Sequence, residues 1–249
     1  MTFTAVARCR DSGQAGLALA TVSIAAGGLC PFFTQRGDIA VCQAYASPRI
    51  GYRMASGMER GESADVAFAA ARSMDAHPSY RQLILLGRGG ETLAYSGPDC
   101  RPWAGHIVDG DVVVAGNVLA GRQVIEAMLQ AFRVSAGQSL SDRLLLALEA
   151  GRDAGGQATA DGLGLSEGSA MVRVLGSREA AGWPVLDLRV DLHNSAIHEL
   201  RRLYQVHGVY AGYSDRREND PPNAGSIVGY EAAALKRGGA FSERPSVYR

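Results

Sequence analysis

Lysine is almost absent from this chain of 249 residues, because Lys236 is its only lysine. Lys236 lies in a polar C-terminal segment, so the sequence excludes mechanisms that need a lysine in the protein core. Net charge is absent as well, since 25 basic and 25 acidic residues cancel. A chain without basic excess lacks the electrostatic attraction typical of nucleic-acid-binding proteins, and we expect no nucleic-acid partner.

Motifs for metals, phosphates and serine nucleophiles are also missing. The four cysteines, Cys9, Cys30, Cys42 and Cys100, contain no C-x-x-C pair, so we expect free, mostly buried thiols and no zinc site or disulfide scaffold. The five histidines form no H-x-x-x-H pair. The sequence has no G-x-S-x-G elbow, and no glycine-rich loop opens a helix. We therefore predict no metal or organic cofactor.

One uncharged stretch, residues 15–33, is the only candidate for a membrane or targeting segment. Gly27, Gly28 and Pro31 interrupt it, and a strand-like run precedes it. We interpret this stretch as a buried strand. The sequence therefore predicts no membrane partner and a cytoplasmic protein.

The pattern of apolar residues and turns predicts strands that come as hairpins. Strands are expected over residues 2–8, 16–24, 38–46, 81–86, 92–96, 111–119, 169–175 and 185–191, and helices over residues 50–60, 63–76, 121–136, 139–150 and 195–207. Hairpins argue against a parallel sheet and favour an α+β fold, a four-layer α/β/β/α sandwich of two antiparallel sheets flanked by helices. We expect this domain to span residues 1–209. Residues 210–249 are predicted to be an irregular polar tail that could wrap a neighbour in a homo-oligomer.

Thr2 is the residue whose position suggests chemistry. It opens an apolar strand, and threonine is small enough for removal of Met1 to be expected. The exposed α-amine, with an ordinary pKa of roughly 7.7–8.0, could then take the proton of the Thr2 hydroxyl near neutral pH. Position alone does not separate this nucleophile from an ordinary residue that follows the start methionine.

Short segments in the same order along the chain are similar to one family. They are the start T-F-T-A-V-A-R, residues 16–23, residues 42–51, the C-x-x-W-A-G-H stretch from Cys100 to His106, residues 116–121, residues 187–193 and residues 199–203. On these segments the chain resembles domain-of-unknown-function family 1028, usually described as N-terminal nucleophile (Ntn) hydrolase-like. The resemblance implies the four-layer Ntn sandwich and an N-terminal nucleophile.

Some positions depart from the family's pattern. Ser47 stands where the family has asparagine, and Ile50 where it has tyrosine. The loop around residues 155–158 lacks the acidic and basic residues that relatives carry there. If those residues bind substrate in relatives, this protein has a different substrate or reduced activity.

Three candidate catalytic residues follow. Thr2 is the predicted nucleophile and, through its amine, the general base. Ser23 could hydrogen-bond the chain terminus, or could be a strand-end hydroxyl that meets water. Asn117 follows Gly116 in a central strand, where its amide could donate to an oxyanion, or could mark a β-bulge.

Four residues are candidates for substrate binding. Gln43 is polar in an apolar strand, where it could donate to a substrate carbonyl or cap a neighbouring backbone group. Arg49 could pair with a substrate carboxylate, or could be solvated. His106 with Trp103 could form a pocket wall, or these two residues could have a purely structural role. The resemblance makes Ser169 a candidate for holding the α-amine.

These observations predict an amide hydrolase that cleaves a small amide or N-acyl compound through an ester on Thr2. Two alternatives remain. The first is a binding or assembly protein that kept the sandwich and lost the chemistry. The second is a metal-dependent hydrolase that uses His106, His193 and carboxylates.

Overall fold

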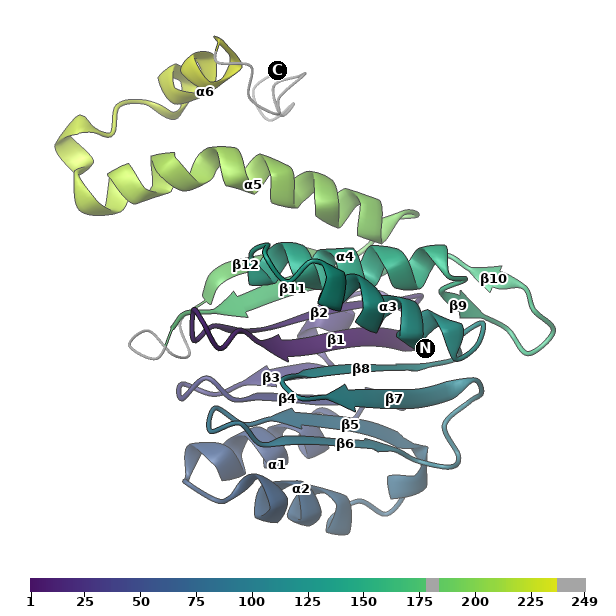
Figure 1. The fold of residues 1–249 in the computed structure, drawn as a ribbon. Helices are drawn as coiled ribbons and strands as arrows, with labels where there is room; N and C mark the ends of the chain where they lie inside the picture. Colours follow the sequence, from purple (N-terminus) through teal and green to yellow (C-terminus); the bar gives the residue numbers. More distant parts are fainter. Residues whose placement is uncertain (178–183, 237–249) are drawn as a thin grey trace. The chain divides into compact units, whose positions relative to one another are not determined.

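The first sheet contains the start of the chain. The structure is a computed structural model that describes residues 1–177 and 184–236. Its six strands are β1 (Thr2–Arg8), β2 (Ala15–Thr21), β7 (Ala104–Asp109), β8 (Val112–Asn117), β11 (Ser169–Leu175) and β12 (Pro184–Val190). They are arranged β12-β11-β2-β1-β8-β7, with every neighbouring pair antiparallel. The strand that begins at Thr2 therefore lies in the middle of the sheet (Figure 1).

The second sheet has four strands and faces the first (Figure 1). The strands are β3 (Pro31–Phe33), β4 (Ile39–Ala44), β5 (Arg81–Leu86) and β6 (Thr92–Ser96), arranged β3-β4-β5-β6 and all antiparallel. A short hairpin of β9 (Gln157–Ala158) and β10 (Gly164–Leu165) forms a separate two-stranded sheet, which a β-bridge between Gln157 and Leu119 joins to the segment after β8. Pro31 stands at the first position of the edge strand β3, where its missing N–H leaves no ladder bond unmade.

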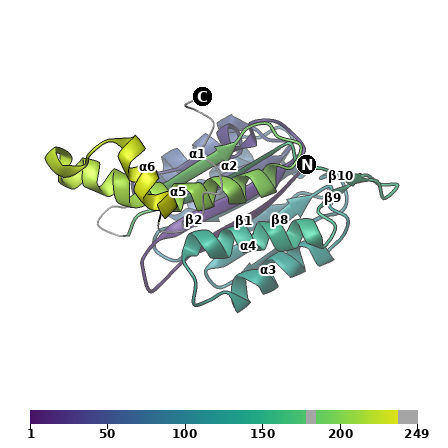
Figure 2. The same ribbon diagram turned by 90° about the horizontal axis from the view of Figure 1, so that it is seen from above.

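Two pairs of helices form the outer layers. Helices α1 (Pro48–Glu59) and α2 (Ala64–Ser73) pack on the second sheet, and α3 (Gln123–Val134) and α4 (Leu140–Asp153) pack side by side on the first (Figures 1 and 2). The Ser63 hydroxyl accepts the N–H of Val66, and the Ser139 hydroxyl accepts the N–H of Asp142, so serine caps start α2 and α4. The predicted four-layer sandwich of antiparallel sheets is confirmed.

The apolar core has a layer between the sheets and a layer under α1 and α2. Val6, Leu17, Val41 and Ile84 belong to the inter-sheet layer. All residues of β2 and all but the last of β1 are buried, because helices cover one face of these strands and the second sheet covers the other. The start of β1 is therefore held by neighbours on every side.

Several boundaries differ from the prediction. Strands β1, β5, β6 and β11 have the predicted bounds, but β2 ends at Thr21, and a turn of 3-10 helix over Ala26–Gly28 precedes β3. The strand β7 was hidden in the sequence because, as an edge strand, it leaves residues such as His106 and Val108 exposed and contains glycine. Among the described residues, no helix has the length and apolarity needed to cross a membrane.

The chain divides into two compact units, residues 1–197 and 198–249. Helix α5 (Ala196–Asn219) continues well beyond the predicted end at residue 207, and α6 (Ile227–Lys236) follows a short 3-10 turn, Pro221–Asn223. The expectation of an irregular tail from residue 210 is thus corrected for the described part, and residues 237–249 lie outside it. Polar residues do not end a helix, whereas the prolines after Asp220 do.

Within the second unit, tyrosines join the two helices. The Tyr210 hydroxyl donates to the Glu231 carboxylate, and the Tyr230 hydroxyl donates to the Val209 carbonyl over 3.0 Å. The rings of Tyr213 and Tyr230 lie 5.2 Å apart. These contacts explain how a strongly polar segment holds a defined helical pair.

Candidate functional site

Thr2 occupies the first position of the central strand β1. It pairs with Asn117 of β8 and is 4% exposed. Its hydroxyl has no hydrogen bond to another residue of the described ranges. The Thr21 hydroxyl donates to the carbonyl of Met1, so the peptide that joins Met1 to Thr2 is held against β2. Thr2 thus carries an uncommitted hydroxyl on a fixed backbone.

A small cavity of about 110 Å³ adjoins this terminus. Its lining consists of Met1, Ala44, Tyr45, Arg101, Asn117 and Val118. Ala44 has φ of 72° and Val118 has φ of 56°, a left-handed conformation that is unfavourable for any residue with a Cβ and most of all for β-branched valine. Such strain gathers at functional sites in proteins, and here it ends β4 and β8 at the same cavity.

The environment of the terminal amine lowers its pKa. Burial lowers the pKa of the Met1 amine from its ordinary value, and the positive charge of Arg101 lowers it further, while Cys30 acts in the opposite direction. A neutral amine can accept a proton, and a protonated one cannot.

Gln82 is the hub of a buried polar network beside Thr2. Its amide nitrogen, which carries two N–H groups, lies within hydrogen-bond distance of three acceptors, the carbonyls of Gly105 (3.0 Å) and Gly116 (2.9 Å) and the Ser96 hydroxyl (2.7 Å). Carbonyl oxygens only accept hydrogen bonds, so this contact determines which end of the Gln82 amide is nitrogen. The Gln82 oxygen must therefore be the amide atom that faces Gln43 and Asn117.

That oxygen accepts from the amide nitrogens of Gln43 (2.8 Å) and Asn117 (3.1 Å). The Gln43 oxygen in turn accepts from the Thr4 hydroxyl over 2.6 Å. Thr4, Gln43, Gln82 and Asn117 are all essentially excluded from solvent. The network thus joins β1, β4, β5 and β8 across the two sheets through bonds that all agree in polarity.

The network restricts what Asn117 and Gln43 can do. The two N–H groups of the Asn117 amide point to Gln82 and, over 3.4 Å, to the Thr2 carbonyl. Asn117 can donate to an oxyanion only by giving up the longer of these bonds. Gln43 uses its amide to join the Thr4 hydroxyl to the Gln82 amide, two side chains in place of the backbone group that the sequence suggested as one of its possible partners.

Ser23 and Ser169 lie together, Ser23 just after β2 and Ser169 at the start of β11, and β2 separates β11 from the strand of Thr2. The Ser169 hydroxyl donates to the Ser23 carbonyl (2.7 Å) and accepts from the N–H of Ala26 (3.3 Å). The Ser23 side chain is exposed, and the hydroxyl that bonds the terminus comes from Thr21. Ser169 therefore stabilises the turn after β2 instead of contacting the amine.

Arg49 and His106 lie apart from the Thr2 cavity. Arg49 is exposed in the first turn of α1, which starts two residues before its predicted start. His106 is on the edge strand β7, where its Nδ1 lies 2.9 Å from the Ser96 hydroxyl and burial lowers its pKa. Trp103 covers Gly105, since a Cβ there would lie 2.5 Å from the indole ring. His106 reaches the network only through Ser96 and Gln82.

Metal-ligating side chains do not gather. Within residues 1–177 and 184–236, no group of three or more His, Cys, Asp or Glu side chains could hold a metal ion. His193 instead accepts the N–H of Ser195 at its Nδ1 over 3.0 Å. Among the described residues, His106 and His193 thus have no set of carboxylates around them such as a metal-dependent hydrolase needs.

Three of the four cysteines are buried near the terminus, and all four are free thiols. Burial raises the pKa of Cys30 to about 12 and that of Cys42 to about 11, and it also raises the pKa of Cys100. At Cys9 burial acts in the same sense, but hydrogen bonds from Ser12 outweigh it and lower the pKa. The thiols near Thr2 are therefore poor nucleophiles.

Iodoacetamide at pH 8 is expected to alkylate the native protein at Cys9 alone. The thiolate reacts, so Cys9 should be modified at least about a hundredfold faster than Cys30 or Cys42. Peptide mapping after timed quenching measures the rates, and the Cys9→Ser variant should stay unmodified. Rapid alkylation of a buried cysteine would show that a thiol near Thr2 also reacts with electrophiles.

Three residues of the site were not predicted from sequence. Gln82 carried the same signal as Gln43, a polar residue in the apolar run R-Q-L-I-L-L. Arg101 lies inside the C-x-x-W-A-G-H stretch, and its Nε donates to the Tyr45 hydroxyl over 3.0 Å. Arg101 and Tyr45 come from segments 56 residues apart, a separation that local pattern does not bridge.

Comparison with known proteins identifies the family. A Silicibacter pomeroyi protein of family DUF1028, known from its crystal structure, superposes with a TM-score of 0.70 at 27% identity, over 82% of this chain and 88% of that one. Anbu, an ancestral beta-subunit from Yersinia bercovieri, gives a TM-score of 0.38 at 12% identity over 86% and 97% of the two chains, too slight a likeness to carry an argument. No curated protein matches significantly. The sequence model of the family of unknown function DUF1028 matches residues 2–200, and the chain therefore belongs to this family.

Proposed function

We propose that this protein is an amide hydrolase whose nucleophile is Thr2, exposed as the N-terminal residue by removal of Met1. The observation that carries the proposal is the uncommitted hydroxyl of Thr2 at the start of a central strand, beside a cavity and a buried terminus. Removal of Met1 adds the space that Met1 occupies to this cavity. A small amide or N-acyl compound is the substrate class that suits its size.

The proposed reaction is acyl transfer in two steps. The Thr2 amine takes the hydroxyl proton as Oγ attacks the amide carbonyl carbon, and the amine then gives that proton to the departing amine. An ester on Thr2 remains. Water, deprotonated by the same amine, cleaves the ester, releases the acid and restores the hydroxyl. No cofactor is required.

The surroundings of the terminus favour this chemistry. Burial and the charge of Arg101 lower the pKa of the Met1 amine, and we expect the same two influences to act on the Thr2 amine once Met1 is removed. The guanidinium of Arg101, at the cavity wall, is also placed to pair with a carboxylate of the substrate, the role that the sequence suggested for Arg49. Backbone N–H groups or Asn117 would hold the oxyanion.

One observation favours the alternative of a binding protein that lost the chemistry. Both N–H groups of Asn117 are already engaged, with Gln82 and with the Thr2 carbonyl. The two functions differ in a simple property: an enzyme of this type acylates itself, and a binding protein does not.

A β-lactone electrophile tests the proposal. Attack by the Thr2 hydroxyl opens the lactone without a leaving group, so the protein should gain the whole mass of one reagent molecule. We expect intact mass and peptide mapping to show loss of Met1 and one adduct at Thr2, absent after heat denaturation. Retained Met1, or a free Thr2 that stays unreactive across a panel of lactones, would contradict the proposal.

A further inference from the structure

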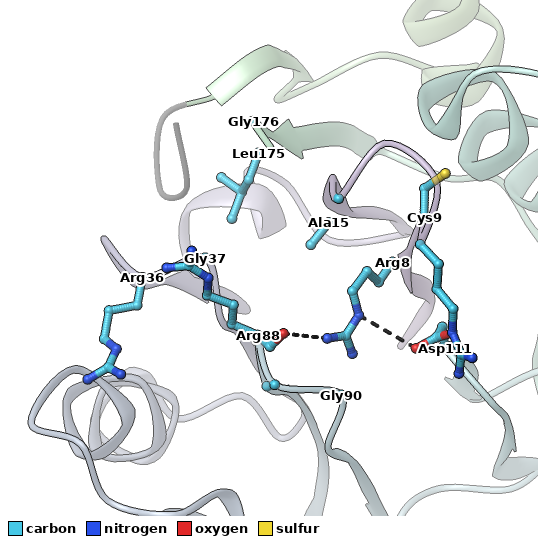
Figure 3. Close-up of a pocket in the computed structure, with 14 residues that line it drawn as sticks. Arg8, Cys9, Ala15, Arg36, Gly37, Arg88, Gly90, Asp111, Leu175 and Gly176 are labelled. Atoms are coloured by element: carbon cyan, nitrogen blue, oxygen red, sulfur yellow. Dashed lines mark hydrogen bonds and ion pairs between the residues drawn. The ribbon is translucent and has the colours of Figure 1, made fainter. Parts of the chain in front are cut away.

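A second and larger cavity, of about 320 Å³, is drawn in Figure 3. It lies at the opposite end of the strand β1 from Thr2. The strand β1 starts at the Thr2 cavity and ends at Arg8 in this pocket, and a seven-residue strand spans about 20 Å. The pocket is lined by residues of the turns β1–β2, β3–β4, β5–β6 and β7–β8 and by the end of β11. It belongs to neither the network nor the cavity described above.

Positive charge is concentrated in this pocket. Four arginines line it, namely Arg8, Arg10, Arg36 and Arg88, against one carboxylate, that of Asp111. The whole chain has no net charge, so this excess is local. Arg10 and Arg8 both pair with Asp111, which leaves one carboxylate to balance two guanidinium groups.

Arg8 has unused hydrogen-bonding capacity in the pocket. Its side chain is only 12% exposed. Its Nη1 donates to the Arg88 carbonyl over 2.6 Å, while its Nε lies 3.5 Å from the Asp111 carboxylate (Figure 3). Its Nε and Nη2 are buried and have no hydrogen-bond partner among the described residues. Buried donors without hydrogen-bond acceptors are unfavourable, so the Arg8 guanidinium keeps unused donors at the wall of the pocket.

The turns around the pocket are held in place. The N–H of Arg88 donates to the Asp38 carboxylate over 2.7 Å, and the Thr34 hydroxyl donates to the same carboxylate over 2.8 Å. These bonds tie the β5–β6 turn to the β3–β4 turn. Gly37 has φ of 90° and Gly90 has φ of 118°, so both turns need glycine at the pocket wall. A ligand would meet a largely preorganised site.

We infer that this pocket binds a small, multiply charged oxyanion that bears a phosphate group or several carboxylates. Guanidinium groups match the geometry of phosphate and carboxylate oxygens through paired N–H donors. The cavity volume is at the lower end of the range for small-molecule sites, which suits a small anion better than a large one. The inference is independent of the chemistry at Thr2.

Isothermal titration calorimetry of the full chain tests it, with pyrophosphate, inorganic phosphate and citrate as separate probes at constant ionic strength set by sodium chloride. We expect saturable binding of at least one probe with one site per chain. If pyrophosphate binds most tightly, the ligand of the pocket is a phosphorylated compound. If citrate binds most tightly, the ligand is a polycarboxylate. Absence of saturable binding for all three would overturn the inference.

Variants locate the site. Arg8→Gln should weaken binding at least about tenfold, because a charged hydrogen-bonding partner is lost. Arg36 is exposed, so Arg36→Ala preserves the fold if Arg8→Gln fails to fold, and it should weaken binding several-fold. The matched control is Arg122→Ala, an exposed arginine of similar charge on the helix side of the first sheet.

The control Arg122→Ala and the variant Thr2→Ala should both bind as the wild type does. Unchanged binding by Arg8→Gln and Arg36→Ala would place the anion elsewhere and refute the site. Equal weakening by Arg122→Ala would show attraction to general surface charge, which also refutes it. If the wild-type chain binds the anion but is not labelled by the lactone, the proposed function fails and this inference stands.

Discussion

Replacing Thr2 by alanine is expected to abolish lactone labelling, with a loss in rate on the order of a thousandfold or more. Alanine removes the only atom that attacks while the strand and its pairing with Asn117 remain. Thr2→Ser keeps the hydroxyl and should retain labelling. Mass spectrometry of timed samples measures all three rates.

Thr2→Val is the matched control for shape, because valine replaces the hydroxyl by a methyl group of similar size. The Thr2 hydroxyl has no hydrogen bond within the described part of the chain, so Thr2→Val should unfold at nearly the wild-type temperature. Serine, alanine and valine are all small enough for removal of Met1, which keeps the comparison equal. An adduct of normal yield on Thr2→Ala would place the nucleophile elsewhere and refute the proposed mechanism.

The second large effect is expected from Gln82→Leu. Leucine fills a similar volume but makes none of the hydrogen bonds that Gln82 makes. The amides of Gln43 and Asn117 and the carbonyl of Gly116 then lose a partner at buried positions, and the carbonyl of Gly105 loses one at a partly buried position. We expect a loss of about 3 kcal/mol in the free energy of unfolding, which corresponds to a fall of about 6–12 °C in Tm.

Gln130→Leu is the control for this variant, since Gln130 is exposed on α3 and the same replacement there should change Tm by no more than about 2 °C. Thermal unfolding followed by circular dichroism measures both. If Gln82→Leu is as stable as Gln130→Leu, the network does not support the fold as described. If it folds, we expect slower lactone labelling, because the Asn117 amide beside Thr2 is no longer held in one orientation by Gln82.

Hairpins and caps could be predicted from sequence because their causes are local. The alternation of residues 2–8 and the turn residues that follow specify β1 and its hairpin with β2. Ser63 and Ser139 mark the starts of α2 and α4 through bonds to residues three positions later. The predicted end of α5 at residue 207 was wrong, because the prediction gave the polar composition more weight than the prolines that terminate the helix.

The candidate site was harder to predict because its contacts are not local. Thr2 and Asn117 could be singled out from their places in strands, and the structure pairs them. Arg49 and Ser169 were also singled out, yet Arg49 is on an exposed helical turn and Ser169 bonds the turn after β2. Which of several polar residues meet depends on strand order and register, which no short segment contains.

Local patterns of residues were enough to predict that hairpins and amphipathic helices stack in four layers, and that Thr2 is the first residue of an apolar strand. The contacts by which Gln82 joins Gln43 to Asn117, and the gathering of arginines from several hairpin turns in one pocket, depend on how distant elements pack. The bonds of Gln82 to Gln43 and Gly116 span 39 and 34 residues. The periodicity of apolar residues predicts which face of a helix or strand is buried. The direction of each hydrogen bond and the total charge of a pocket depend on residues from distant segments that meet only in the folded chain.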